Sequence, residues 1–418
     1  MVTLRLPPAR AGPYRKISDR SSRPAARYLS TKTTGRTLVL CFDGTASAFD
    51  SDNTNVVHFF KLLRRDTDEQ LCYYQPGIGT YMKPGAVSQL LRWGAKVLDV
   101  ATAWYLYEHV HGGYKFLMEN YQAGDRICLF GFSRGAYTAR ALAGMLHKIG
   151  LLCKGNDEQV PFAYELYENA DMESKQIAQG FKDTFCTPVS VDFVGVWDTV
   201  ASVGLIRHKT LPFATSNDNI RVFRHALALD ERRVSFRPDK CRVCSQVEES
   251  KSAAKPAGGT PNTNALEVWF AGCHGDVGGG ALPDTERHSL ANISLQWMVG
   301  EVIVAQCGVL FDTGRLNEIG VKITLVGNDI AVEDRDVCAD MHDALEAPSA
   351  LFWKLLERVW LPHKHTNAWT PTFDRPHHGR GRTIQSANPN FHSSVKRRME
   401  LLGYTPSATW EGSPRYVD

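Results

Sequence analysis

Apolar runs of strand length recur along the chain, and each ends in small or polar residues. They cover residues 37–42, 127–130, 189–197 and 266–271, and a fifth candidate covers 321–326. The first run is continuously apolar, which indicates a strand that is buried on both faces. We therefore expect these segments to lie inside a sheet.

Segments with helical features separate the apolar runs. Residues 85–120 and 288–307 predict helices, and residues 136–143 are helix formers without a breaker. Strands that alternate with helices are typical of a mostly parallel sheet with helices on both faces. The fold class expected is α/β, and the polar residues that follow the strands should meet at one sheet edge.

Two segments are expected to be insertions in one catalytic domain, residues 37–418. Residues 241–264 are rich in Ser, Lys, Gly, Pro and Asn and predict a mobile loop. Residues 340–380 contain apolar positions at helical spacing, with Trp353, Trp360 and Trp369 nearby. Such a stripe forms either a cap that contacts a membrane or ordinary core packing.

Charge is distributed unevenly along the 418 residues. Residues 1–36 hold nine Lys or Arg and one acid, a net +8, so the rest carries −5 of the total +3. The body is therefore not basic, and a nucleic-acid partner is not expected. We expect residues 1–36 to be a basic, disordered leader. A mitochondrial presequence is the alternative, although Pro7, Pro8, Pro13 and Pro24 would interrupt its helix.

The cysteines favour a reducing compartment. Most of the ten lie in apolar runs, as Cys41, Cys128 and Cys186 do, and do not suggest a disulfide framework. Cys241 and Cys244 form a lone C-x-x-C, which is weak evidence for zinc, so we predict no metal. No apolar stretch reaches 18 residues. A cytoplasmic protein is expected, with mitochondrial or membrane-peripheral placement as alternatives.

The strand at 127–130 runs into Gly131-Phe-Ser-Arg-Gly135, which a helix follows. A nucleophilic serine needs this sharp strand-to-helix turn, and the flanking glycines relieve its crowding. The pattern alone occurs often by chance, but its strand–turn–helix context favours Ser133 as a nucleophile. The alternative is a structural turn with an ordinary serine.

A nucleophilic serine requires a histidine base and an acid that orients it. Asp198 and His274 follow the next two predicted strands, in the order Ser, acid, His that this turn accompanies. Asp198 could instead cap a helix, and His274 could be a hydrogen-bonded loop residue. Asp276 is an alternative acid but lies close to His274 along the chain, and His392 is the rival base.

The developing oxyanion needs backbone amides as donors. The amide of Arg134 at the helix start is one candidate, and Gly44 or Thr45 after the first strand would supply the second. A simple Asp-Gly turn at Asp43 and Gly44 is the alternative. The glycines at 77–79 and 278–280 lack the context of a nucleotide site, so no cofactor is expected.

Several motifs together resemble one known family. The matching segments are Leu40–Thr45, Thr54–Val56, Pro76–Thr80, Gly124–Arg126, Leu129–Arg140, Val196–Thr199, His225–Arg232 and Trp269–Gly280. In this order they resemble the α/β-hydrolase family that includes type VI secretion phospholipase effectors and uncharacterised fungal and bacterial relatives. The resemblance spans roughly residues 37–400.

The resemblance implies an α/β-hydrolase fold, a triad of Ser133, Asp198 and His274, and a lipid ester, often a glycerophospholipid, as substrate. Peripheral contact with a membrane would follow, and no cofactor is needed. Two alternatives remain open: a soluble carboxylesterase or thioesterase that acts on small acyl compounds, and a hydrolase scaffold that only binds.

Overall fold

The computed structural model describes the greater part of residues 35–418. The described ranges are 35–44, 51–65, 67–77, 95–169, 171–200, 219–233, 236, 238, 263–319, 321–324, 327–330, 332–343, 345–346, 361–363, 372–374 and 378–418. Residues 35–418 form one compact unit.

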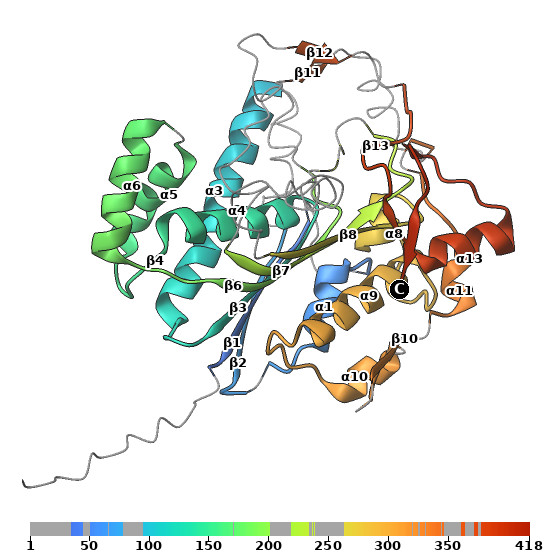
Figure 1. Ribbon diagram of the computed structural model, residues 1–418, viewed down its shortest axis with the longest axis horizontal. Coiled ribbons are helices and arrows are strands. Elements are labelled where there is room, and N and C mark those ends of the chain that lie inside the picture. Colours follow the sequence, from blue (N-terminus) through green and yellow to red (C-terminus); the bar gives the residue numbers. More distant parts are fainter. Residues whose placement is uncertain are drawn as a thin grey trace, which may run out of the picture. The chain divides into compact units, whose positions relative to one another are not determined.

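An eight-stranded sheet forms the centre of this unit (Figure 1), and every pairing in it is parallel. The strands lie in the order β16-β14-β8-β7-β6-β3-β1-β2. In that order their bounds are Arg415–Val417, Asn390–His392, Asn264–Phe270, Ile220–Ala228, Val191–Trp197, Arg126–Phe132, Thr37–Phe42 and Gln70–Gln75. Parallel pairing brings the carboxyl ends of all eight strands to one edge.

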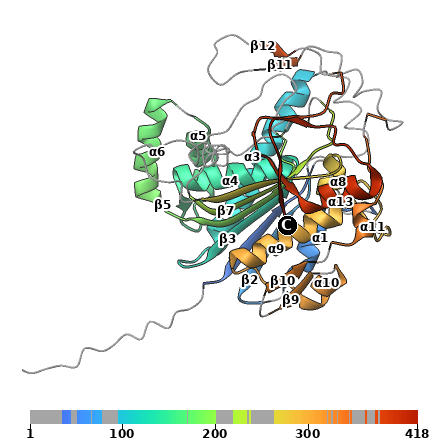
Figure 2. The ribbon, with the colours of Figure 1, turned by 45° about the vertical axis from the view of Figure 1, so that its right-hand side comes forward.

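Helices cover both faces of the sheet (Figures 1 and 2). One face carries α3 (Ala95–Asn120), α4 (Arg134–Ile149), α5 (Val160–Glu168) and α6 (Met172–Phe185). The other carries α1 (Asn55–Leu62), α9 (Leu290–Ala305), α10 (Thr313–Glu318) and α11 (Asp334–Val337). The helices α8 (His274–Gly278) and α13 (Ser393–Leu402) follow β8 and β14.

Alternate residues of each strand explain why both faces are covered. In β1, Leu38, Leu40 and Phe42 pack beneath α3 and α4, whereas Val39 and Cys41 pack on the α1 and α9 side. All five side chains are fully buried. A strand with two buried faces has no reason to alternate with polar residues, which is why its sequence is continuously apolar.

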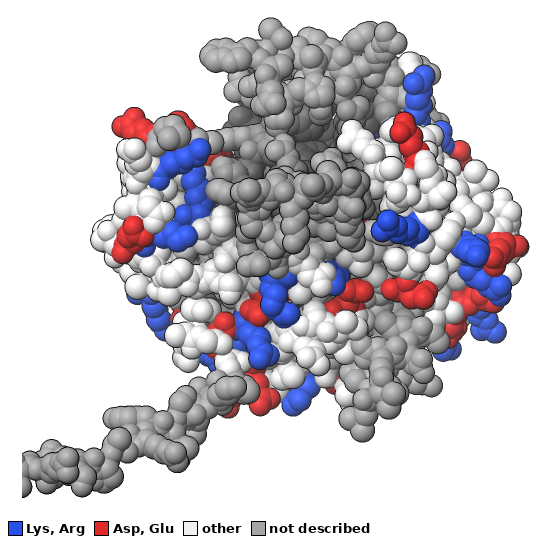
Figure 3. All heavy atoms as spheres, in the orientation of Figure 1, with Lys and Arg blue, Asp and Glu red and all other residues white. Residues whose placement is uncertain are grey.

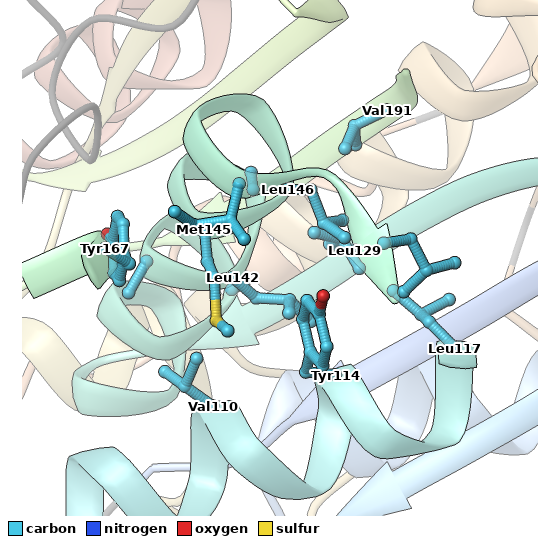
Figure 4. Packing of buried hydrophobic residues seen from close by; sticks show 14 of the residues in the cluster. Val110, Tyr114, Leu117, Leu129, Leu142, Met145, Leu146, Tyr167 and Val191 are labelled. Carbon is cyan, nitrogen blue, oxygen red and sulfur yellow. The ribbon is translucent and has the colours of Figure 1, made fainter. Parts of the chain in front are cut away.

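Figure 4 shows the layer between the sheet and its first set of helices. Val110, Tyr114 and Leu117 of α3 and Leu142, Met145 and Leu146 of α4 pack in one cluster with Leu129 of β3 and Val191 of β6. This packing fixes the axis of α4, the helix whose first turn follows Ser133.

Short elements complete the described residues. They are β4 (Leu151–Leu152) with β5 (Cys186–Thr187), β9 (Val321–Thr324) with β10 (Gly327–Ile330), β11 (Leu361–His363) with β12 (Thr372–Asp374), β13 (Thr383–Ile384) with β15 (Thr409–Trp410), and the 3₁₀ turn Asp157–Gln159. The pair of β13 and β15 is parallel, and the other three are antiparallel.

The α/β fold class is confirmed, with differences in detail. The predicted helix at 85–120 is described from Ala95 onward, and the predicted run at 321–326 forms the hairpin strand β9 outside the main sheet. Strand β7 was not predicted. Its buried Arg224 and His225 interrupt the apolar pattern. Arg224 is accommodated by an ion pair with Glu301, and His225 by a hydrogen bond between its Nδ1 and Glu267.

Several predicted segments lie outside the described residues. They are the leader up to residue 34, most of the loop at 241–264 with Cys241 and Cys244, and much of the segment 340–380. Among the described helices, none is long and apolar enough to cross a bilayer. On the face in Figure 3, the described Lys and Arg side chains are interspersed with Asp and Glu.

Gly135 lets the start of α4 approach the end of β1 closely. A Cβ at Gly135 would lie 2.2 Å from the carbonyl oxygen of Phe42 and 2.4 Å from that of Asp43. These are backbone atoms, so a side chain cannot be accommodated by a rotamer change. The second glycine of the serine motif is therefore required by packing.

We expect Gly135→Ala to lower the free energy of unfolding by about 1–3 kcal/mol or more, because it overpacks backbone against backbone. Chemical denaturation measures this change. Gly180→Ala is the matched control, because Gly180 lies inside α6 with open space around its Cβ position. That variant should gain roughly 0.5–1 kcal/mol from helix propensity. Equal stability of the two variants would contradict the close approach.

Candidate active site

Ser133 stands at the sharp turn between β3 and α4. Its backbone has φ 58° and ψ −120°, a conformation that residues with a side chain rarely adopt. The turn is held by the Ser133 amide, which donates to the carbonyl of Trp197 at 3.0 Å. Ser133 is thereby fixed beside the end of β6, and its side chain is nearly buried.

Asp198 and His274 meet in a buried hydrogen bond. Asp198 follows β6 directly, also with a positive φ of 36°, and it is fully buried. His274 is the first residue of α8, and its Nδ1 lies 2.6 Å from Asp198 Oδ2. The three residues expected from the sequence are thus gathered at the carboxyl edge of the sheet.

A capping box places His274. The Asp276 carboxylate accepts from the Cys273 amide at 2.9 Å, and the Cys273 side chain accepts from the backbone of Asp276. Asp276 also bonds Nδ1 of His342 at 2.7 Å. Asp276, the alternative acid of the sequence analysis, therefore holds the start of α8 and is not bonded to the His274 ring.

Arg382 was not predicted from the sequence, and it pairs with Asp198. Its Nη1 lies 2.6 Å from Asp198 Oδ1 and its Nη2 lies 2.9 Å from Oδ2. Burial opposes ionisation of Asp198, but the attraction of Arg382 and the hydrogen bond with His274 outweigh it. The pKa of Asp198 is consequently held well below its ordinary value. The carboxylate is therefore favoured in its charged form.

Gly381 explains how Arg382 reaches this position. A Cβ at Gly381 would lie 1.7 Å from the carbonyl oxygen of Ser407, so only glycine permits this contact. The carbonyl of Arg382 then accepts from the Thr409 amide at 2.8 Å. The Arg-Gly-Arg sequence at 380–382 is the only local feature that could have drawn attention to Arg382, but it does not indicate that the partner is an aspartate 184 residues away.

Two aromatic rings enclose the His274 imidazole. The Phe132 ring lies 4.5 Å from it and the Phe236 ring 4.8 Å, nearly at a right angle. Burial lowers the pKa of His274, and the bond with Asp198 opposes that shift without cancelling it. The imidazole is therefore favoured in its neutral form, which is the form able to accept a proton.

The predicted oxyanion donors divide into three cases. The amide of Gly44 donates to the Asp43 carboxylate at 2.6 Å, and Thr45 lies outside the described residues. A Cβ at Gly44 would lie 3.5 Å from the Cβ of Ser133, so Gly44 is next to the serine. Arg134 begins α4, where an amide has no intrahelical acceptor.

The Arg134 side chain is a separate matter from its backbone amide. Burial lowers the pKa of its guanidinium to about 10.

His392, the rival base, has a different environment. It precedes α13, and its Nδ1 accepts from the amide of Ser394 at 3.2 Å, which makes it an N-cap. Its ring stacks on Phe270 at 4.8 Å, and burial lowers its pKa to about 4. No carboxylate among the described residues forms an ion pair with it.

Residues 36–301 match the family described as the catalytic domain of Tle1-like phospholipase effectors of the type VI secretion system. The chain belongs to this family. The expected family resemblance is thereby confirmed, and the Tle1-like family is one of phospholipase-type hydrolases. The match ends before Arg382, so this arginine comes from a part of the chain that the family description does not cover.

An uncharacterised protein of Saccharomyces cerevisiae is 28% identical to this chain over 80% of it and 65% of its own length. Two solved structures are similar. One is an uncharacterised protein from Pseudomonas aeruginosa, 19% identical over 66% of this chain and 46% of its own, with a TM-score of 0.37. The other is the Tle1 effector bound to the VgrG spike, 18% identical over 60% and 52%, with a TM-score of 0.30. The chain thus spans about two thirds of the yeast relative and about half of each solved chain.

Asp198→Asn should cost about 3–5 kcal/mol of stability, because it leaves the buried Arg382 cation uncompensated. Thermal and urea unfolding measure the loss. Asp334→Asn is the matched control, since Asp334 also forms two bonds with an arginine, Arg397, but on the surface. We expect little change there. A similar small change in both variants would rule out a buried ion pair at Asp198.

Proposed function

We propose that this chain is a serine hydrolase that cleaves carboxylic esters, of the phospholipase A or lipase type. The observation that carries the proposal is the buried bond between Asp198 and His274 beside the strained turn of Ser133. A nucleophile, a base and an orienting acid gathered at one sheet edge have the roles that this chemistry needs.

In the proposed reaction, Ser133 Oγ attacks the ester carbonyl while His274 Nε2 takes the serine proton. The tetrahedral intermediate collapses, the bond to the alcohol breaks, and His274 gives its proton to the leaving alcohol. Water then attacks the acyl-serine with His274 again as base, which releases the acid and restores Ser133. Asp198 holds Nδ1 protonated and stabilises the imidazolium.

The amide of Arg134 is the proposed first oxyanion donor, supported by its place at the start of a 16-residue helix. Gly44 or Thr45 is the proposed second. For Gly44 to serve, its amide would have to leave the carboxylate of Asp43 and turn to the substrate. Burial raises the pKa of Asp43, although Tyr74, Thr54 and Gly44 all donate to it. Protonation of this carboxyl group would weaken its hold on the Gly44 amide.

A lipid ester is the proposed substrate class, and family membership supports it. The reaction needs no metal or organic cofactor, and a peripheral contact with lipid is part of the proposal.

Fluorophosphonate should label Ser133, because the reagent reports an activated serine. We expect peptide mapping to place the label there, and Ser133→Ala to abolish it. His274→Ala should lower the labelling rate by several orders of magnitude. In contrast, His392→Ala should label normally, although it should lose about 1 kcal/mol of stability from the helix cap and more from the cavity left by its buried ring. Normal labelling of His274→Ala would mean that another residue acts as the base. A wild-type protein that is not labelled would indicate a hydrolase fold that only binds its ligand.

The lipid proposal predicts interfacial kinetics. The hydrolysis rate of a short-chain phosphatidylcholine should rise steeply when its concentration passes the micellar threshold, because a lipase acts at an interface. A soluble p-nitrophenyl ester serves as the control and should follow simple saturation. A preference for the dispersed ester, with no rise for micelles, would identify a small-molecule esterase instead.

A further inference from the structure

The environment of Asp198 contains more than a triad requires. Its Oδ1 accepts from the Ala228 amide at 3.0 Å and from Arg382 Nη1, and its Oδ2 binds His274 Nδ1 and Arg382 Nη2. The carboxylate is completely enclosed, and Arg382 is only 5% exposed. Each carboxylate oxygen therefore has two partners.

We propose that Arg382 is a positioning residue of the active site, which holds the Asp198 carboxylate in one orientation and sets the charge that His274 experiences. This inference rests on the proposed function, because it assigns the arginine a role in activating Ser133 through His274.

The first part of the role is geometric. Two parallel N–H···O bonds from a planar guanidinium fix the plane of a carboxylate, which one bond cannot do. Arg382 is itself fixed, because Nη1 donates to the carbonyl of Ala228 at 2.9 Å and Nη2 to that of Phe236 at 2.5 Å. Ala228 and Phe236 flank the site from β7 and the segment that follows it. Rotation of the Asp198 carboxylate away from His274 would therefore break its two bonds with Arg382.

The second part of the role is electrostatic. An isolated Asp–His pair strongly favours the imidazolium, because the carboxylate charge is uncompensated. Here the Arg382 cation neutralises that charge at contact distance. The base can therefore remain neutral, even though it is bonded to an ionised acid.

Other charged groups face His274 and have to be counted. Glu231 accepts from the His274 amide at 3.2 Å, which favours the imidazolium. Arg233 opposes this effect, because its guanidinium is bound to Glu231 at 2.8 Å. Asp276 lies in the same helix and is bonded to the backbone of Cys273 and to His342. Glu231 and Asp276 thus have partners of their own, and the cation that contacts Asp198 is Arg382.

The test is the pH dependence of fluorophosphonate labelling at Ser133, measured on the full chain as wild type, Arg382→Gln and Arg382→Lys. This reaction needs no knowledge of the natural substrate. Labelling requires neutral His274, so its rate falls as the pH drops through the pKa of the base.

In Arg382→Gln, the uncompensated pair of Asp198 and His274 takes up a proton at higher pH, whichever residue carries it. The acid limb of the labelling profile, where the rate falls with decreasing pH, should therefore move to higher pH by about one unit or more. Arg382→Lys keeps a positive charge, but its shorter side chain holds that charge farther from Asp198 and cannot form the two parallel bonds. It should therefore compensate the carboxylate less well and shift the limb in the same direction by less. Arg398→Gln is the matched control. It removes another buried arginine, which donates to the carbonyls of Val337 and Ala339, and it should leave the limb unchanged.

An acid limb that stays at its wild-type pH in both Arg382 variants would overturn the proposal, even if labelling slowed uniformly, because uniform slowing is what a structural role produces. If Arg382→Gln does not fold, the lysine variant alone decides by the same criterion. The result for the lysine variant is checked by an NMR pH titration of isotope-labelled His274 in the Ser133→Ala background. The midpoint of the His274 titration should rise when Arg382→Lys is added.

Failure of the inference can be told apart from failure of the proposed function. A wild type that does not label at Ser133 would overturn the proposed hydrolase. A wild type that labels normally, beside Arg382 variants with an unshifted limb and an unshifted His274 midpoint, would overturn only the role of Arg382.

Discussion

A buried negative charge is the constraint on which the rest of the site depends. Asp198 is fully enclosed, and an unpaired carboxylate in such a place would be costly by several kcal/mol. Its partners come from three separate parts of the chain: Ala228 at the end of β7, His274 at the start of α8, and Arg382 just before β13. The acid therefore joins these parts, and satisfying its charge is a condition for assembling the sheet edge correctly.

The orientation of His274 follows from the same constraint. The cap of α8 fixes the position of its backbone, and Asp198 binds its Nδ1. The rings of Phe132 and Phe236 pack against the imidazole. Gly278 takes part as well, because a Cβ there would overlap the Phe132 ring. A side chain restrained from several directions has little freedom to lose, and such preorganisation suits the role of base that we propose for His274.

The sequence contained enough information for the centre of this arrangement. Buried parallel strands are apolar without interruption, and a serine, an aspartate and a histidine after three such strands had to share one edge. Strand β7 could not be identified by the same rule, because it contains the buried polar residues Arg224 and His225. The free-energy cost of burying them is offset by Glu301 and Glu267, which are distant in the sequence and reach them only in the folded structure. Arg382 was missed for a related reason. Its partner is identified by tertiary contact alone, and the glycine that admits it shows no distinctive pattern.

The distance along the chain between Asp198 and Arg382 has a consequence for biosynthesis. The two residues are separated by 184 positions. At a translation rate of about 5–20 residues per second, the acid is made roughly 10–40 s before the cation. During that interval the end of β6 carries a charge that the interior does not yet neutralise, so Asp198 remains hydrated and the edge stays open. The charge of Asp198 is thus compensated only after the C-terminal region has been synthesised, so we expect this edge of the sheet to be completed late in the synthesis of the chain.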